Sequence, residues 1–261
     1  MIQTDSRDRR CAIAVMAKAP RAGRVKTRLC PPLAPEEAMA MSAAFLRDVT
    51  ENIREAARDT AIDGVIAYAP DGTAGLFDGL LADGTALLLA DGETGLARPM
   101  PDGVQGFGRS LLHAIDGLFA QGYAAAIVLN SDSPTLPTEM LRQAARALLD
   151  GELDRAVLGP AEDGGYYLLG MRRPHAALFA DIAWSTETVA ADTRARAREF
   201  GLPMVELIPW YDVDDGAALL RLLEEQDRPA IHAPFAAPAT MACVARLDLP
   251  HRLLALPQGR S

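Results

Sequence analysis

Short apolar runs alternate along the chain with longer segments in which apolar residues recur at helical spacing. The short runs predict strands at residues 12–17, 65–69, 86–90, 124–129, 156–158, 166–169 and 205–208. The longer segments predict helices at about residues 35–57, 110–120, 137–148 and 188–200. Because strands that alternate with helices form βαβ units, we expect an α/β fold with a mostly parallel open sheet and helices on both faces.

The C-terminal part of the sequence differs in composition from the rest. After residue 226 it becomes rich in Pro and Ala, which favours an extended tail over another layer of the sheet. We therefore expect a principal domain at residues 1–226 and an extension at residues 227–261, which could wrap this domain or the partner subunit of a homodimer. Frequent Gly and Asp at residues 71–103 predict turns and an edge hairpin.

The overall charge limits the classes of function. The 261 residues carry a formal net charge of −9, so the chain lacks the basic field of a typical nucleic-acid-binding protein. No apolar stretch approaches the roughly 20 residues that cross a bilayer, and the first residues lack the apolar core of a signal peptide. We expect a cytoplasmic protein with no membrane span and no nucleic-acid partner.

The cysteines and histidines carry little chemical signal. Cys11, Cys30 and Cys243 are widely spaced and odd in number, which favours reduced, structural thiols over disulfides or a zinc site. The four histidines show no ligand spacing, and the sequence contains no arrangement typical of a Ser-His-Asp or Cys-His nucleophile.

The first predicted strand leads into a basic loop, residues 18–28, with five cations and no acid: Lys18, Arg21, Arg24, Lys26 and Arg28. Both lysines of the protein lie in this loop. A loop after the first parallel strand lies where α/β folds bind ligands, and ammonium and guanidinium groups bind phosphate oxygens. Gly23 can adopt a positive φ and so allow a phosphate to approach closely. The loop predicts a pyrophosphate clamp, with a solvated surface loop as the alternative.

Acidic residues follow three later strands. Asp132, after the strand at 124–129, could hold Mg²⁺ or Mn²⁺, or could form a turn or helix cap. Asp163 precedes two glycines, which are equally consistent with a ligand site and with a hairpin turn. Asp212 and Asp214 would share one side of an extended segment and could complete a metal site, or could cap the next helix.

A Gly-rich turn precedes the helix predicted at residues 110–120. Residues 105–109, Gln105-Gly106-Phe107-Gly108-Arg109, could shape a turn that binds a nucleotide base, with Gln105 and Gly106 as binding residues. The alternative is that this turn only begins the helix. The sequence leaves both interpretations open.

Five segments, taken in order, resemble the DUF2064 family: Ala-x-x-Pro-x-x-Gly-x-Val-Lys-Thr-Arg-Leu, Ser-Asp-Ser-Pro, Gly-Pro-x-x-Asp-Gly-Gly-Tyr-Tyr-Leu-Leu-Gly, Trp-Ser-Thr and Asp-Val-Asp. This is a group of bacterial GT-A fold proteins classed as glycosyltransferases, some of them associated with arsenosugar biosynthesis. The basic loop is also similar to the Lys-Ser/Thr-Arg-Leu loop of the 2-phospholactate guanylyltransferases. The resemblance covers about residues 12–215 and implies a nucleotide-diphospho-sugar transferase (GT-A, Rossmann-like) fold.

The resemblance also implies roles for individual residues. The residues that match its phosphate loop are Lys18, Arg21, Lys26 and Arg28. Asp132 matches the metal-binding position and Asp163 the turn near the acceptor. Many GT-A enzymes have Asp-x-Asp at the metal position, whereas Asp132 lies between two serines, so we expect Asp214 to supply the second ligand for Mg²⁺ or Mn²⁺.

These features together predict a metal-dependent transferase that moves a sugar from an NDP-sugar to a small acceptor. Asp132 would act with the metal, and Asp163 as a general base or as a contact that positions the acceptor hydroxyl. One alternative is a guanylyltransferase-like nucleotidyltransferase that joins an NTP to a small phosphorylated or carboxylated acid. Another is a non-catalytic nucleotide-binding subunit, with which the lone Asp132 is also consistent.

Overall fold

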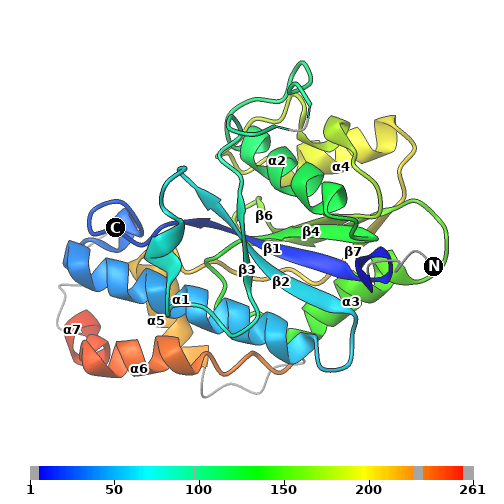
Figure 1. Cartoon of the computed structure of the whole chain (residues 1–261). Helices are drawn as coiled ribbons and strands as arrows, with labels where there is room; N and C mark the ends of the chain where they lie inside the picture. Colours follow the sequence, from blue (N-terminus) through cyan, green and yellow to red (C-terminus); the bar gives the residue numbers. More distant parts are fainter. Residues whose placement is uncertain (1–5, 97, 226–231, 255–261) are drawn as a thin grey trace.

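In the part of the chain that the computed structural model describes, residues 6–96, 98–225 and 232–254, seven strands form one sheet in the order β3-β2-β1-β4-β6-β5-β7 (Figure 1). The strands are β1 (Cys11–Lys18), β2 (Ile62–Ala69), β3 (Ala86–Leu89), β4 (Ala125–Leu129), β5 (Ala156–Pro160), β6 (Tyr166–Met171) and β7 (Met204–Glu206). β6 runs antiparallel to β4 and β5, and every other neighbouring pair is parallel. All seven predicted strands are confirmed.

Helices cover both faces of this sheet (Figure 1). On one face lie α2 (Phe107–Ala120) and α4 (Val189–Glu199). On the other lie α1 (Pro35–Ala56), α3 (Thr138–Leu149) and α5 (Gly216–Glu225), with α6 (Pro238–Arg246) and α7 (Leu249–Leu254) packed outside them. Short 3-10 helices occur at Ser6–Arg9, Thr27–Leu29, Ala74–Phe77 and Ala176–Phe179. Within the described residues, no helix combines the length and apolarity needed to cross a membrane.

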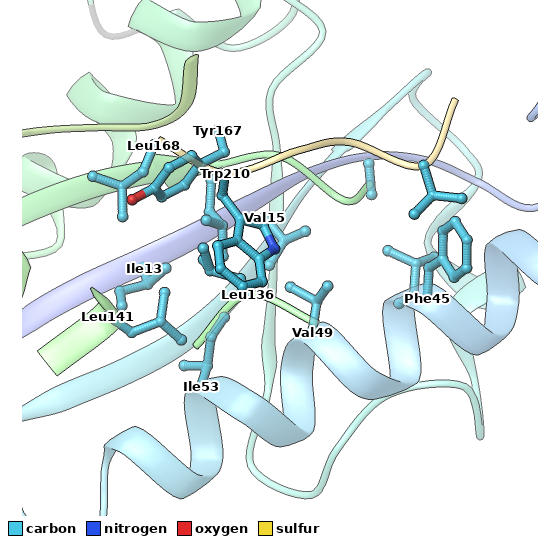
Figure 2. Packing of buried hydrophobic residues seen from close by; sticks show 14 of the residues in the cluster. Ile13, Val15, Phe45, Val49, Ile53, Leu136, Leu141, Tyr167, Leu168 and Trp210 are labelled. Atoms are coloured by element: carbon cyan, nitrogen blue, oxygen red, sulfur yellow. The ribbon is translucent and has the colours of Figure 1, made fainter. Parts of the chain in front are cut away.

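The central strand β1 shows why both faces are covered. Successive side chains of a strand point to opposite faces. Ala12 and Ala14 therefore pack towards α2, while Ile13 and Val15 pack towards α1, and all four side chains are fully buried. Figure 2 shows Ile13 and Val15 against the side chains of α1 that face the sheet: Phe45, Val49 and Ile53. Burial on both faces explains the continuous apolar run in the sequence.

Two sequence predictions are corrected by the fold. β3 is an edge strand paired in parallel with β2, not part of a hairpin, because the long segment before it carries the chain back to the start of the sheet. Residues 238–246 and 249–254 are helical, not extended, because Pro238 lies in the first turn of α6, where proline is tolerated, and Ala-rich sequence favours helix. The predictions for residues 227–231 and 255–261 lie outside the described residues.

Candidate functional site

The carboxyl ends of β1, β2 and β4 meet at one edge of the sheet. The chain passes from β1 to β2 on one side, whereas β4 joins β1 on the other, and open α/β sheets bind ligands at such a switch point. A cavity of about 390 Å³ lies here, between the basic loop, α1, the first turn of α2 and the residues after β4 and β7. Its volume lies within the range of small-molecule sites.

This cavity has a cationic side and an apolar side. Lys18, Arg24 and Arg28 of the basic loop line the first. The second has a floor of small strand residues and the side chain of Phe107, which is 51% exposed at the start of α2. The first turn of α2 also lines the cavity, through Phe107 and Ser110, and the positive end of its helix dipole favours an anion. The cavity can therefore accommodate a phosphate group and a flat ring together.

Lys26, also a residue of the basic loop, lies between two carboxylates that line the same cavity, those of Asp132 and Asp214. Its Nζ is 2.8 Å from Asp132 Oδ1 and 2.9 Å from Asp214 Oδ1, and it donates a 2.8 Å hydrogen bond to the backbone oxygen of Val213. The side chain is 6% exposed, and Nζ lies 5.3 Å from the ring centroid of Phe45. Burial acts to lower the pKa of Lys26, but the two carboxylates outweigh it and raise the pKa above its usual value. An ammonium has three N–H donors, so all three have partners inside the protein.

The structure brings Asp132 and Asp214 together, as the predicted metal pair requires. Their side chains are 32% and 34% exposed. Asp132 Oδ1 also accepts a hydrogen bond from Ser131 Oγ at 2.8 Å, whereas its Oδ2 makes none within the described residues. Asp214 Oδ2 lies 3.6 Å from Arg28 Nη1.

A metal ion would fit this acid pair only with help from a ligand. In the described part of the chain, no group of three or more His, Cys, Asp or Glu side chains could hold one. Mg²⁺, however, is commonly held by one or two carboxylates together with substrate phosphates and water. Two carboxylates that already converge on one cation, Lys26, meet that requirement. Metal binding by Asp132 and Asp214 stays a prediction.

Asp212 bonds to the turn after β4 and, unlike the acid pair, does not line the first cavity. Its Oδ1 accepts hydrogen bonds from Ser133 Oγ at 2.6 Å and Asn130 Nδ2 at 2.5 Å. Burial, together with the charges of Asp132 and Asp214, raises the pKa of Asp212 to about 6, although the two hydrogen bonds act to lower it. Asp212 therefore ties the segment after β7 to the turn after β4 and supports the wall that carries the acid pair.

A second cavity of about 350 Å³ adjoins the first, and Arg28 and Asp214 line both. Its other acids are Glu162, Asp163, Asp212 and Asp215. Arg221 lies over the ring of Tyr211, 3.9 Å from its centroid, and pairs with both oxygens of Glu162. Asp163 lies in the exposed turn between β5 and β6, where its Oδ1 accepts a 2.9 Å hydrogen bond from the N–H of Gly165. An acidic lining suits hydroxyl or amine groups better than anions.

Four other predicted residues lie beside the first cavity without lining it. Arg21 and Gly23 lie in an exposed part of the basic loop, where Gly23 has the predicted positive φ, 70°. Gln105 and Gly106 form the turn before α2, directly next to Phe107. Phe107 belongs to residues 105–109, the segment predicted from the sequence as a candidate base-binding turn, and it lines the cavity itself. The contribution of α1, through Ser42 and Leu46, had no signal in the sequence.

Known proteins resemble this chain over its length. A family model, described as an uncharacterized protein conserved in bacteria (DUF2064), matches residues 52–186. The comparison of this chain with curated protein sequences found no match. A solved structure from Desulfovibrio desulfuricans G20, provisionally assigned as a nucleotide-diphospho-sugar transferase, is 25% identical, with a TM-score of 0.72 and coverage of 92% of this chain and 97% of the other.

A second solved structure is more distant. CMP:2-keto-3-deoxy-manno-octonic acid synthetase, complexed with CTP, is 13% identical, with a TM-score of 0.50 and coverage of 84% of this chain and 100% of the other. The comparisons confirm the predicted GT-A, nucleotide-diphospho-sugar transferase fold. The Desulfovibrio desulfuricans structure also supports a transferase that uses a nucleotide substrate, whereas the 13% identical synthetase shows the fold alone.

Proposed function

This chain belongs to the DUF2064 family, and from its site we propose that it is a metal-dependent glycosyltransferase that moves a sugar from an NDP-sugar to a small acceptor. The observation that carries the proposal is the cavity at the switch point, whose lining combines the basic loop and the amino end of α2 with the acid pair and a floor of small apolar strand residues. A nucleoside diphosphate offers anionic oxygens to the first and a flat base to the floor.

The donor would be held mainly through its phosphates and its base. Lys18 and Arg28 line the cavity and would bind the diphosphate, with Arg21 and Gly23 approaching from the exposed part of the loop. Phe107 would stack on the base. Gln105 and Gly106, which immediately precede Phe107, would complete the base-binding turn. Cations held near the leaving diphosphate would stabilise the charge that develops on it during transfer.

Mg²⁺ or Mn²⁺ would be held by Asp132 and Asp214. When bound, the ion supplies Lewis-acid stabilisation of the leaving diphosphate. The protein's own contribution is to keep the two carboxylates close together at the cavity wall, with Arg28 beside Asp214. Asp132 thereby has its catalytic role through the bound ion.

The acceptor would enter through the second cavity, which meets the first at Arg28 and Asp214. Asp163 would act there as a general base or orient the acceptor hydroxyl. Because this cavity is lined mainly by carboxylates, it disfavours a phosphorylated or carboxylated acceptor. This lining favours sugar transfer to a neutral acceptor over the nucleotidyltransferase alternative, in which an NTP reacts with an anionic acid.

A binding experiment tests the proposal. Thermal unfolding is measured with UDP-, GDP- and ADP-sugars and with NTPs, each with and without Mg²⁺ or Mn²⁺. A ligand at about 100 times its Kd stabilises the folded protein by ~2.7 kcal/mol, which for this length raises Tm by roughly 5–10 °C. We expect an NDP-sugar with metal to give such a shift, and hydrolysis or transfer of its sugar to release NDP.

The other outcomes each have a distinct meaning. Pyrophosphate release from an NTP would identify a nucleotidyltransferase. Nucleotide binding that is indifferent to metal, with no turnover, would identify a non-catalytic subunit. No thermal shift with any nucleotide would refute the proposed function.

A further inference from the structure

The two lysines of the basic loop have different surroundings. Lys18, at the end of β1, is exposed and lines the cavity. The side chain of Lys26 is 6% exposed, and its three donors are taken by Asp132, Asp214 and the backbone oxygen of Val213. A phosphate oxygen would therefore find available N–H donors on Lys18 but none on Lys26.

The backbone at Lys26 points to the same distinction. This residue has φ 48° and ψ 37°, a left-handed conformation that is uncommon for a residue with a side chain. It precedes the 3-10 helix Thr27–Leu29, and its side chain is buried while Arg24 and Arg28 remain exposed. Unfavourable backbone conformations persist where the surrounding contacts fix them, and here those contacts are made by the ammonium.

We propose that Lys26 is a positioning residue, an internal counter-ion that holds Asp132 and Asp214 by their Oδ1 atoms, and that it is not a phosphate ligand. Without a cation between them the two carboxylates would repel one another, and neither would keep its place at the cavity wall. A compact ammonium suits a single point between two acids, whereas the planar fork of an arginine does not. This proposal rests on the proposed function in one respect only, the assignment of Asp132 and Asp214 as metal ligands in sugar transfer.

Removal of the ammonium tests this role without any nucleotide. Lys26→Met keeps the length of the side chain and removes its charge. In EDTA we expect its Tm to fall by roughly 4–10 °C, because two like charges remain close together. We expect Mn²⁺ to restore at least half of the loss, because a divalent cation can then also contact the two Oδ1 atoms that the ammonium of Lys26 otherwise occupies. Mn²⁺ affinity, measured by electron paramagnetic resonance, should rise about 10-fold or more over the unsubstituted protein.

Two further variants make the result specific. Lys18→Met, the matched control, should leave Tm in EDTA and Mn²⁺ affinity nearly unchanged and should weaken the binding of metal-free UDP, GDP or ADP. Lys26→Met/Asp214→Asn removes one of the two like charges, so it should regain stability in EDTA and lose the response to Mn²⁺. This double variant keeps the test valid if Lys26→Met alone does not fold.

Three results would overturn the proposal. The first is an unchanged Tm for Lys26→Met in EDTA. The second is a loss of stability that neither Mn²⁺ nor Asp214→Asn corrects. The third is metal-free nucleotide binding that Lys26→Met weakens as much as Lys18→Met does. If instead the unsubstituted protein binds no nucleotide, the proposed function fails while the Mn²⁺ and Tm measurements on Lys26→Met still decide the role of Lys26.

Discussion

One buried carboxylate of α1 holds the start of the C-terminal helices, and its removal gives a quantitative test of the fold. Asp48 of α1 is fully buried and accepts hydrogen bonds from the backbone N–H groups of Ala239 at 3.0 Å and Thr240 at 2.6 Å. These two groups belong to the first turn of α6, whose N–H groups have no partner within the helix. Asp48 therefore caps a helix that lies far from it in the sequence.

Asp48→Ala would leave both N–H groups without an acceptor. An unsatisfied buried donor costs ~1–3 kcal/mol, so the two together cost roughly 2–6 kcal/mol. Burial raises the pKa of Asp48, because the charged carboxylate is removed from water. This desolvation lowers the free energy of unfolding, and Asp48→Ala removes it, which offsets part of the loss. We expect a net loss of about 2–4 kcal/mol, or a decrease in Tm of roughly 4–16 °C.

The assay is urea unfolding followed by fluorescence, together with limited trypsin digestion that reports on release of α6 and α7. Glu36→Ala, an exposed acid in the first turn of α1, is the control and should change stability by no more than about 0.5 kcal/mol. Asp48→Asn, which keeps one acceptor, should lie between the two. A loss below about 0.5 kcal/mol for Asp48→Ala, with unaltered trypsin cleavage, would refute the capping argument.

Three further predictions concern packing, pH and the site. Gly159→Ala would place a Cβ 2.3 Å from Cζ of the buried ring of Tyr167, so we expect a loss of about 2–3 kcal/mol in urea unfolding. The hydrogen bonds from Arg252 lower the pKa of Glu37 below its usual 4.5, so this carboxylate stabilises the fold above that pH and ceases to do so as pH falls through the lowered pKa. Glu37→Gln should thus be less stable than the unsubstituted protein at pH 7, by about 0.5–1 kcal/mol, and equally stable in acid. Phe107→Ser should weaken nucleotide binding about 10-fold by calorimetry, with little change in Tm because the ring is 51% exposed.

Each of these has an outcome that contradicts it. Full stability of Gly159→Ala would mean that β5 and β6 can separate without loss of packing. A difference for Glu37→Gln that is the same at pH 7 and in acid would remove the ion pair as its cause. Unchanged nucleotide affinity in Phe107→Ser would place the base elsewhere in the cavity.

The strands could be predicted because a parallel strand covered on both faces is a continuous apolar run, as β1 shows. The basic loop and Asp132 could be placed at one edge of the sheet because they follow predicted strands. The contacts of Lys26 with Val213 and Asp214 could not be predicted, because these residues lie 187 and 188 positions away in the sequence. Only the order of the strands in the sheet brings them close to Lys26. The homodimer, the cytoplasmic location and the metal stay predictions.

The C-terminal helices show another kind of limit. Proline and alanine content favoured a tail, but the acceptor that completes the first turn of α6 is supplied by Asp48, 191 positions before Ala239. Local composition carries no information about such a distant cap. A buried acid within a helix, such as Asp48, is nevertheless a signal that some other segment supplies its donors.

The contacts of Lys26 also bear on how this site can be inherited. Its three members follow β1, β4 and β7, so no contiguous fragment shorter than residues 26–214 contains them all. The segment that identifies the family, residues 52–186, includes Asp132 but neither Lys26 nor Asp214. A relative could therefore keep the family signature after losing the charge balance of the site. Sorting the family by the residues that correspond to Lys26 and Asp214 would separate proteins that retain this charge arrangement from those that keep only the fold.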